Sequence, residues 1–517
     1  MSRARAVLQR VPEILKQTTT RHTTTFTLKP LAAHGHTGFD APEVGDHVTS
    51  DPPQLSDIPG PRSLPGIGAM WQYLPGGKYH GLDLNIAIKH MNTEHGDVVR
   101  EEIVPGLNLI RLYDPNDFAD VYKAEGECPH RVLFGLLTHY NNVYNDGAQG
   151  LLTSQDSEWK QLRSQVQQPI LQPKAVNGFA KQHANIASDF VDRIARRIDD
   201  TGSITNFLPE IYKYVTEGVG TVCFDKRLGL LEDNNAEGEQ FIRAVGETLT
   251  LTQKELQLLP LYRHVPTPVF ARFTAANNLI QKLSTRYMQE AMQDKEHRPT
   301  GQLVKHLLFH SDLTQRHIFT FLSEFFAAGV DTTGHYLAFT LYALAKNPKV
   351  QEKLYSELKD VTDDDITSGA LESAPYLRAF LKESLRVYPV APGLGRTLRK
   401  DAVLGGYNVP AGTNIVLQYD LAGKDPRFVS NPEEFQPERW LRNNKSEKVL
   451  AFTTLPFGFG PRSCPGRRLA GQEVGVAVAK ILQRFRVCYN GGELPIKMQL
   501  LNTPAEPLNF CFTPRSM

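Results

Sequence analysis

Cysteine, net charge and long apolar runs are all scarce in this sequence of 517 residues. Its five cysteines, at positions 128, 223, 464, 488 and 511, have no paired spacing, which argues against a disulfide framework and favours a reducing compartment. The formal charge is only +1, so a general nucleic-acid-binding function is not expected. No run of 18 apolar residues exists, and we therefore expect no transmembrane anchor. These absences leave an ordinary globular protein.

The first 36 residues differ in composition from the rest of the chain. They carry six arginines and lysines against a single acid, and they are rich in threonine. Val7, Val11 and Ile14 share one face at helical spacing, although a proline interrupts the pattern. Such a composition is typical of an organelle transit peptide, most often a mitochondrial one, and the alternative is a disordered basic tail. We expect residues 1–45 to be a transit peptide with a linker, and residues 46–517 to form a single domain.

Helical patterns dominate the remainder of the chain, with short strands at both ends. The apolar spacing predicts two strands around the turn Pro105-Gly106, long helices between about 155 and 400, a strand–turn–strand over 403–417, and strands in the tail 485–513. The strands near the turn are Val98–Val104 and Leu107–Leu112, and the clearest helices are Ala180–Ile198, Phe270–Gln293, Leu313–Lys346 and Pro348–Lys359. The fold class is therefore mainly α with a small β region.

One cysteine, Cys464, lies in a constrained loop that runs from Phe457 to Gly466. Glycines let the backbone of such a loop come close to a ligand, because glycine accepts positive φ and has no Cβ. Arg462 and the start of a helix after Gly466 both favour a thiolate over a thiol. An isolated cysteine is more often a buried, inert residue, and a zinc site fails because no second cysteine or histidine stands at a suitable spacing.

A second unusual stretch lies in the apolar helix expected over Leu322–Leu344. Gly329, Thr332 and Thr333 are locally unfavourable inside a helix, and a threonine hydroxyl that bonds back to a carbonyl bends it. Asp331 beside Thr332 then offers an acid and a hydroxyl for relaying protons. The alternative is a buried helix with a tolerated packing glycine.

Taken together, the motifs resemble those of the cytochrome P-450 superfamily, and in particular its mitochondrial, ferredoxin-dependent group. The resemblance covers the chain from about Pro59 onward. It rests on the haem-ligand pattern F-x-x-G-x-R-x-C-x-G at 457–466, the pattern A-G-x-D-T at 328–332, Glu383-x-x-Arg386, Pro437-Glu438-Arg439-Trp440, and Trp159-x-x-x-Arg163. It implies the family's helix-rich triangular prism, with haem b (iron protoporphyrin IX) held between a distal and a proximal helix.

The resemblance also implies roles for individual residues. Cys464 is the expected axial ligand of the haem iron, and Asp331 and Thr332 are expected to deliver protons to bound dioxygen. The other expected cofactor-binding residues are Trp159, Arg163, Arg396, Arg462 and Phe457, the arginines and the tryptophan facing the haem propionates. Glu383 and Arg386 are expected to form a buried structural pair that Arg439 joins, although a surface ion pair is the ordinary interpretation of a glutamate and an arginine at that spacing.

Basic residues cluster at two further places, Arg378 with Lys382 and Arg467 with Arg468. Such clusters are often only solvated surface. In the mitochondrial group they dock an acidic 2Fe–2S ferredoxin, which is reduced by its NADPH-dependent reductase. The resemblance therefore places the protein in the mitochondrion, on the matrix side, peripheral to the inner membrane.

The expected reaction is insertion of one oxygen atom of O₂ into a C–H bond of a lipophilic substrate, such as a sterol, steroid or secosteroid. By family position, the pocket would be lined by Phe325, Ala328, Val390, Ala391 and Thr503. One alternative is a xenobiotic monooxygenase of broad specificity. Another is a haem-thiolate isomerase or dehydratase that needs no electrons, and the intact Asp331-Thr332 pair argues against it.

Overall fold

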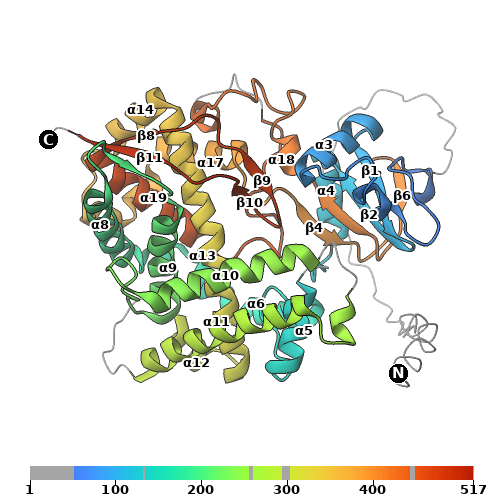
Figure 1. The fold of residues 1–517 in the computed structure, drawn as a ribbon, viewed down its shortest axis with the longest axis horizontal. Coiled ribbons are helices and arrows are strands. Elements are labelled where there is room, and N and C mark those ends of the chain that lie inside the picture. Colours follow the sequence, from blue (N-terminus) through green and yellow to red (C-terminus); the bar gives the residue numbers. More distant parts are fainter. Residues whose placement is uncertain (1–51, 132–133, 256–259, 294–302, 443–448, 516–517) are drawn as a thin grey trace, which may run out of the picture. The chain divides into compact units, whose positions relative to one another are not determined.

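The computed structural model describes residues 52–517, except for 132–133, 256–259, 294–302, 443–448 and 516–517. The expected transit peptide and linker, residues 1–45, lie outside the described residues. Helices make up most of the described chain (Figure 1). The α-helices are α3 (Leu84–His95), α4 (Pro115–Ala124), α5 (Gly135–Tyr144), α6 (Asp156–Leu171), α7 (Pro173–Asn177), α8 (Ala180–Arg197), α9 (Leu208–Phe224), α10 (Ala236–Glu255), α11 (Pro268–Gln293), α12 (Leu303–His310), α13 (Gln315–Lys346), α14 (Pro348–Leu358), α15 (Asp363–Ser368), α16 (Ala370–Ser373), α17 (Pro375–Val387), α18 (Tyr419–Ala422) and α19 (Arg467–Arg484).

The strands are short and form small sheets. They are β1 (Val98–Val104), β2 (Leu107–Leu112), β3 (Ser203–Ile204), β4 (Leu394–Thr397), β5 (Ala402–Leu404), β6 (Tyr407–Val409), β7 (Asn414–Leu417), β8 (Phe485–Tyr489), β9 (Ile496–Met498), β10 (Asn502–Pro504) and β11 (Phe510–Pro514). One sheet has the order β1-β2-β7-β4, another β3-β11-β8, and two are the pairs β5-β6 and β9-β10. The fold class predicted from the sequence is confirmed.

The strand–turn–strand predicted over 403–417 is confirmed, but the two strands do not pair with each other. Its two strands, β6 and β7, follow one another in the chain but lie in different sheets. β6 pairs with β5, whereas β7 runs parallel to β2 and antiparallel to β4. The sequence correctly predicted a break between the strands at the turn residues Pro410-Ala411-Gly412. These turn residues could not indicate that β7 pairs with β2, about 300 residues earlier in the chain, as well as with the nearby β4, because the choice of β2 depends on packing between distant segments.

α13 is the longest described helix, and apolar contacts bury most of it. Its N-terminus is capped by the Thr314 side chain, which accepts a hydrogen bond from the backbone of His317. The helix ends at Lys346, and its C-cap Asn347 precedes the proline that opens α14. The glycine and threonines at 329–333 do not interrupt it. Burial on nearly every face outweighs their poor helix propensity, since tertiary packing supplies most helix stability.

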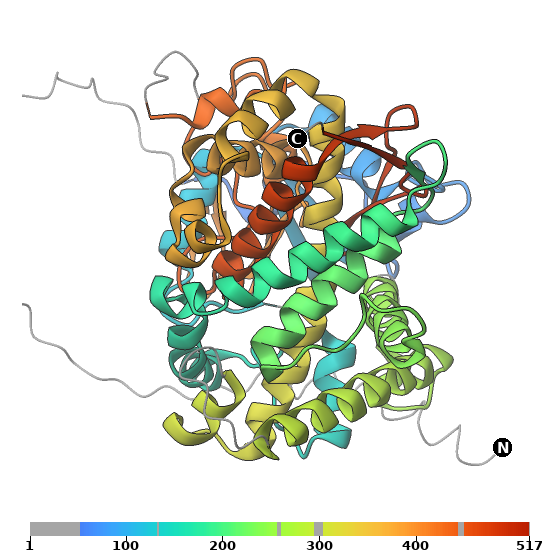
Figure 2. The same cartoon turned by 90° about the vertical axis from the view of Figure 1, so that its left-hand side faces the viewer.

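Two glycines let α9 approach α13 closely. A Cβ at Gly329 would lie 2.9 Å from Cγ1 of Val219, and a Cβ at Gly334 would lie 2.7 Å from Cε1 of Tyr212. Both partners belong to α9, so any larger residue at these two positions would push the helices apart. Figure 2 shows from another side how α8 and α19 also pack together in the same helical region.

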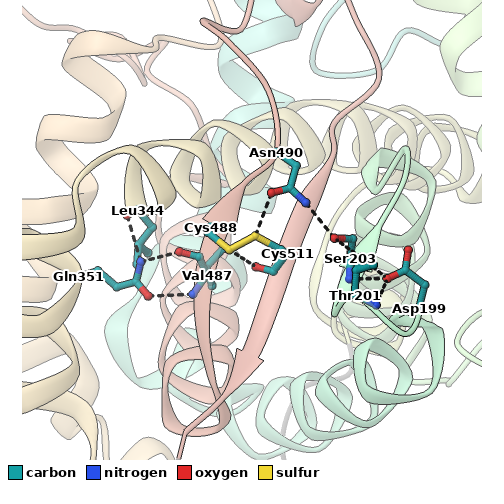
Figure 3. The surroundings of a disulfide bond; sticks show 9 residues. All are labelled: Asp199, Thr201, Ser203, Leu344, Gln351, Val487, Cys488, Asn490 and Cys511. Atoms are coloured by element: carbon teal, nitrogen blue, oxygen red, sulfur yellow. Dashed lines mark hydrogen bonds between the residues drawn. A yellow bond between two sulfur atoms is a disulfide. The ribbon is translucent and has the colours of Figure 1, made fainter.

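The expectation that the cysteines are unpaired is wrong for Cys488 and Cys511, which form a disulfide across β8 and β11 (Figure 3). The two cysteines stand 23 residues apart in the sequence, a spacing that matches no disulfide framework. The antiparallel register nevertheless places them directly opposite each other, with 5.0 Å between their Cα atoms. Within the described part of the chain, no helix is both long and apolar enough to span a membrane.

Candidate functional site

A cavity of about 300 Å³ lies between α13 and the loop that carries Cys464. From α13, the residues that line it include Phe325, Ala328 and Thr332. From the opposite side come Phe457 and Cys464, so the sequence's two unusual stretches meet at one place. Their separation in the chain is more than 100 residues, and only the fold brings them together.

Two tight turns build the Cys464 loop. Gly458 and Gly460 have φ of 71° and 72°, in the left-handed region that favours glycine. The backbone N–H of Cys464 donates to the carbonyl of Phe457 at 2.8 Å, which closes the loop. Gly466 has an ordinary φ of −83° and precedes the first turn of α19. Its role is therefore to begin that helix, and no positive φ is needed there.

Cys464 is half-buried, and desolvation of its thiol raises its pKa. The Gly466 backbone N–H and the guanidiniums of Arg163, Arg131 and Arg467 oppose that rise by favouring the thiolate. The sequence pointed instead to Arg462 as the positive neighbour. That guanidinium lies over the Trp159 ring, 4.9 Å from its centroid, and donates to the carbonyl of Pro129.

Four arginines cluster beside the cavity; Arg163, Arg396 and Arg462 are buried, and Arg131 is half-buried. Arg163, Arg396 and Arg462 were predicted from motifs, and the structure adds Arg131. Each of the four has a buried side-chain nitrogen without a hydrogen-bond partner among the described residues: Nε of Arg131, Arg163 and Arg462, and Nη2 of Arg396. Arg131, Arg163 and Arg462 line the cavity, whereas Arg396 does not line it and pairs with Glu125 at 2.6 Å.

The arginines repel one another. Burial and the charges of Arg396 and Arg462 lower the pKa of Arg131 to about 9. Burial, with Arg396 again, lowers the pKa of Arg462 to about 10. Buried charges that lack partners are costly, so this cluster is built for a negatively charged group with several acceptor oxygens. Two carboxylates, such as the haem propionates, fit these donors.

Sequence reasoning missed Arg131 because no motif spacing marks it. It follows Pro129-His130 in a loop, and its Nη2 donates to the carbonyl of Arg462, 331 residues away in the chain. Trp159 and Arg163, one turn apart on α6, were found from their spacing, and both line the cavity. Phe457 also lines it and packs edge-on against Tyr336 of α13.

Asp331 and Thr332 are neighbours in sequence but lie on different sides of α13. Thr332 lines the cavity, and its hydroxyl donates to the carbonyl of Ala328 at 2.8 Å, as its sequence context predicts. Asp331 is buried and does not line the cavity. Its carboxylate faces α9, where it accepts a hydrogen bond from the Tyr212 hydroxyl at 2.8 Å.

The cavity is mostly apolar away from the arginines. Four residues expected in its lining, Phe325, Ala328, Val390 and Ala391, are there. The prediction for Thr503 is wrong, because that residue does not line the cavity and Leu501 does. Thr503 is held elsewhere because it lies in β10, where its hydroxyl donates to the carbonyl of Lys497 in the paired strand β9.

An acid that the sequence did not reveal, Glu324, also lines the cavity. Its carboxylate accepts hydrogen bonds from the Asn141 side chain at 3.0 Å, the Thr153 hydroxyl at 3.1 Å and the Leu152 backbone N–H at 3.1 Å. Burial nonetheless raises its pKa to about 7. A Cβ on Gly150 would overlap this carboxylate, so the glycine is required for the contact. Glu324 thus ties the segment 150–153 to α13.

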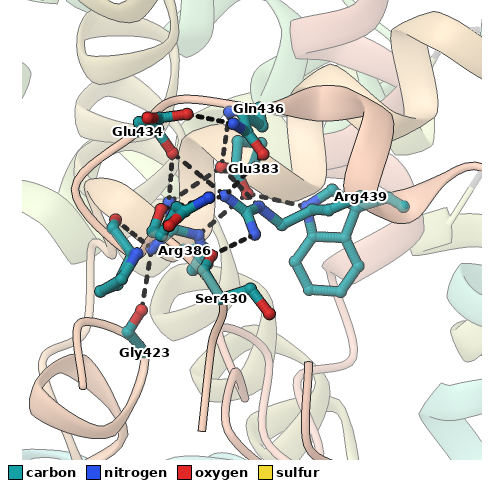
Figure 4. Close-up of polar contacts among 10 residues, drawn as sticks. Glu383, Arg386, Gly423, Ser430, Glu434, Gln436 and Arg439 are labelled. Carbon is teal, nitrogen blue, oxygen red and sulfur yellow. Dashed lines mark hydrogen bonds and ion pairs between the residues drawn. The ribbon is translucent and has the colours of Figure 1, made fainter. Parts of the chain in front are cut away.

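Glu383, Arg386 and Arg439 form one buried cluster (Figure 4). Oε1 of Glu383 accepts from Arg386 Nη2 at 2.8 Å and from Arg439 Nε at 3.0 Å, and Trp440 donates to Oε2. Arg386 also donates to backbone carbonyls, including that of Gly423. The side chains of the glutamate and both arginines have 0% exposure and none lines the cavity, so their geometry is that of a structural clamp.

Three of the four basic residues expected at a docking face are surface residues. Arg378, Lys382 and Arg468 are exposed, and Arg467 is half-buried with a bond to the Ser463 hydroxyl. The Lys382 ammonium lies 5.6 Å from the Trp440 ring centroid. The first pair lies on α17 and the second opens α19, and these helices pack together where Leu377 approaches Gly475.

Comparison with known proteins agrees with this geometry. The family model described as Cytochrome P-450 matches residues 58–512. Probable cytochrome P-450 49a1 of Drosophila melanogaster is 33% identical, over 94% of this chain and 88% of its own length. Cytochrome P-450 302a1, mitochondrial, of the same fly is 32% identical, over 87% of this chain and 94% of its own length. The mitochondrial 25-hydroxyvitamin D-1 alpha hydroxylase of Rattus norvegicus is 32% identical, over 86% of this chain and 90% of its own length.

The family model matches nearly the whole described chain, and Cys464 faces the threonine-bearing helix α13 across a largely apolar cavity. This chain therefore belongs to the cytochrome P-450 family of haem b-dependent monooxygenases.

Proposed function

We propose that this protein inserts one oxygen atom of O₂ into a C–H bond of a sterol, steroid or secosteroid. The observation that carries the proposal is the cavity itself, in which apolar side chains from α13 and from residues 390–394 face the Cys464 loop. A large apolar lining suits a large lipid-like substrate. The similarity to a protein named as a vitamin D hydroxylase supports the secosteroid class.

The residues of this chain that would hold the haem are those with unused donors. Cys464 would supply the thiolate ligand, and Arg131, Arg163, Arg396 and Arg462 would share the propionates. Trp159 would add its indole N–H, and Phe457, which lines the cavity with Cys464, would contribute an apolar contact. When bound, the haem supplies the iron at which O₂ is activated, and the electron-donating thiolate favours cleavage of the O–O bond.

Thr332 and Asp331 are proposed to manage the protons of the reaction. The Thr332 hydroxyl is in the cavity, and it can donate to or accept from a water there once it releases the Ala328 carbonyl. Asp331 is the adjacent acid from which that hydroxyl would be resupplied. The carboxylate must turn from α9 toward the cavity to do so, and its single side-chain hydrogen bond to α9 permits such a rotation.

Electrons are proposed to come from NADPH through a reductase and a 2Fe–2S ferredoxin. Arg378, Lys382, Arg467 and Arg468 lie on two helices that pack together, and α19 begins three residues after Cys464. Positive charge next to the thiolate loop would attract an acidic partner and orient it, which makes the encounter sensitive to salt. Several relatives are named as mitochondrial, which supports a mitochondrial location, on the matrix side and peripheral to the inner membrane.

A spectral titration of the purified, haem-loaded protein tests the substrate class. Sterols, secosteroids, ecdysteroids, fatty acids and lipophilic xenobiotics are added in turn, and the low-spin to high-spin shift of the ferric haem is recorded. A tight shift with one steroid class supports the proposal. Weak shifts across many unrelated apolar compounds would favour a broad xenobiotic oxidase, which the apolar lining also suits.

A second experiment tests the need for electrons. The compound with the largest spectral shift is incubated with the enzyme, a ferredoxin, its reductase and O₂, with and without NADPH. Product that forms only with NADPH supports a monooxygenase. Product formed from a peroxide substrate without NADPH would identify the isomerase or dehydratase alternative.

A further inference from the structure

The Asp331 carboxylate lies on the side of α13 that faces away from the cavity. Successive residues of a helix point about 100° apart, which separates the acid from Thr332. Oδ1 of Asp331 accepts from the hydroxyl of Tyr212, which projects from α9. Whatever protonates this acid must therefore reach it from the α9 side of the helix.

Tyr212 joins the acid to a second cavity. This cavity, of about 720 Å³, is lined by α9, by α10 and by the segment 199–206, and Tyr212 is one of its lining residues. Polar and charged side chains make up much of the lining, among them Arg197 and Glu239, whose side chains are 51% and 42% exposed. The cavity is thus a polar depression at the surface that water can enter.

The structure holds the tyrosine in place with two neighbours on α13. Gly334 leaves the space that the Tyr212 ring occupies, because an added Cβ would lie 2.7 Å from Cε1 and 2.8 Å from Cδ1. His335 stands one turn after Asp331, with Nε2 3.2 Å from the Tyr212 hydroxyl and Nδ1 3.4 Å from Oδ2 of Asp331. The histidine is 3% exposed, and its Nδ1 makes no hydrogen bond within the described residues.

We propose that Tyr212 and His335 form the route by which Asp331 is reprotonated from the surface cavity. Tyr212 passes its hydroxyl proton to Oδ1 of Asp331 and takes one from a water in the cavity. Two O–H bonds break and two form, and the hydroxide left in the cavity is neutralised by bulk buffer. The imidazole of His335 lies within 3.4 Å of both groups, and a small shift of Nδ1 onto Oδ2 of Asp331 would give the proton a second path. Burial and the Asp331 charge raise the pKa of Tyr212, so the tyrosine relays protons without remaining ionised.

This inference rests on the role proposed above for Asp331, and the experiment separates the two. The haem-loaded protein is combined with NADPH, a reductase and a 2Fe–2S ferredoxin, and O₂ consumption is measured without added substrate in H₂O and D₂O. Tyr212→Phe keeps the ring on Gly334 but removes the hydroxyl. Tyr140→Phe is the matched control, because it removes a tyrosine hydroxyl bonded to Asn278, and Tyr140 lines neither cavity.

We expect Tyr212→Phe and Asp331→Asn each to slow O₂ consumption by about 10-fold or more and to enlarge the solvent isotope effect, since positioned acid–base groups contribute ~10²–10⁴ in rate. Tyr140→Phe should keep the wild-type values. If Asp331→Asn consumes O₂ slowly while Tyr212→Phe keeps the wild-type rate, the inference is overturned and the proposed role of Asp331 still holds. If both variants consume O₂ like wild type, the role of Asp331 itself fails.

A second readout does not depend on turnover. In protein labelled with ¹³Cζ-tyrosine, the exchange of the Tyr212 hydroxyl proton is followed from the isotope shift of Cζ in mixtures of H₂O and D₂O. Asp331→Asn should speed that exchange by removing the charged acceptor, and Gly334→Ala should do the same by displacing the ring. Exchange that is equally fast in wild type and Asp331→Asn would show that the hydrogen bond is absent, and the inference would then fall.

Discussion

The carboxyl of Glu324 predicts an unusual dependence of stability on pH. Its bonded neighbours are uncharged, namely Asn141, Thr153 and the backbone of Leu152, so no cation compensates for its burial. Burial raises its pKa from 4.5 to about 7. Protonation of an acid stabilises the protein when the pKa of that acid is higher in the folded state than in the unfolded state. This stabilisation is fully present below the unfolded-state pKa and is lost as the pH rises through the folded-state pKa.

The size of the effect follows from the two pKa values. One pKa unit corresponds to about 1.4 kcal/mol, and the linkage relation integrated between about pH 5.5 and pH 8 gives a loss of about 2 kcal/mol. The loss should be largest between about pH 5.5 and pH 7 and should level off above that range. Glu324→Gln keeps the shape of the side chain and removes the ionisation, so the variant should lack this loss.

The assay is urea unfolding of wild type and Glu324→Gln in parallel across this pH range, followed by far-ultraviolet circular dichroism. The free energy of the variant relative to wild type should increase by about 2 kcal/mol toward high pH, as the linkage relation gives. Glu506→Gln, which removes an exposed carboxylate, is the matched control. A difference that stays flat with pH, or that shifts in favour of wild type, would refute the reasoning, because Glu324 would then be charged and stabilised throughout.

Three further outcomes follow from the clusters described above. Glu383→Ala leaves Arg386 and Arg439 buried without their carboxylate, so it should destabilise the protein by about 3–5 kcal/mol in urea unfolding; a loss below 1 kcal/mol would contradict the clamp. Arg131→Gln should speed transfer of haem to apomyoglobin roughly 10-fold or more, because a charge-assisted hydrogen bond contributes ~1.5–3 kcal/mol. The same substitution should stabilise the haem-free protein, because it removes the repulsion between Arg131 and Arg462. Unchanged haem loss would exclude Arg131 from the propionate site. Arg378→Glu with Lys382→Glu should raise the KM for ferredoxin and flatten its salt dependence, without changing the substrate-induced spin shift; an unaffected KM would exclude this face as the docking site.

The sequence alone determined the features whose chemistry is local. The Cys464 loop, the Asp331-Thr332 pair and the Trp159-Arg163 pair are defined by residue type and short spacing, and all could be located before any coordinates. The strands Val98–Val104 and Leu107–Leu112 and the long helices were also predictable, because their apolar periodicity lies within one segment.

Only the tertiary structure decided which distant groups meet. Arg131 joins the arginine cluster across 331 residues, Tyr212 reaches Asp331 across 119, and Cys488 faces Cys511 because two strands pair in one register. The pKa of Glu324 likewise depends on its burial beneath segment 150–153. The residues next to Glu324 in the sequence do not indicate this burial. Burial, electrostatic coupling and strand register are properties of the packed molecule, and short sequence patterns carry little information about them.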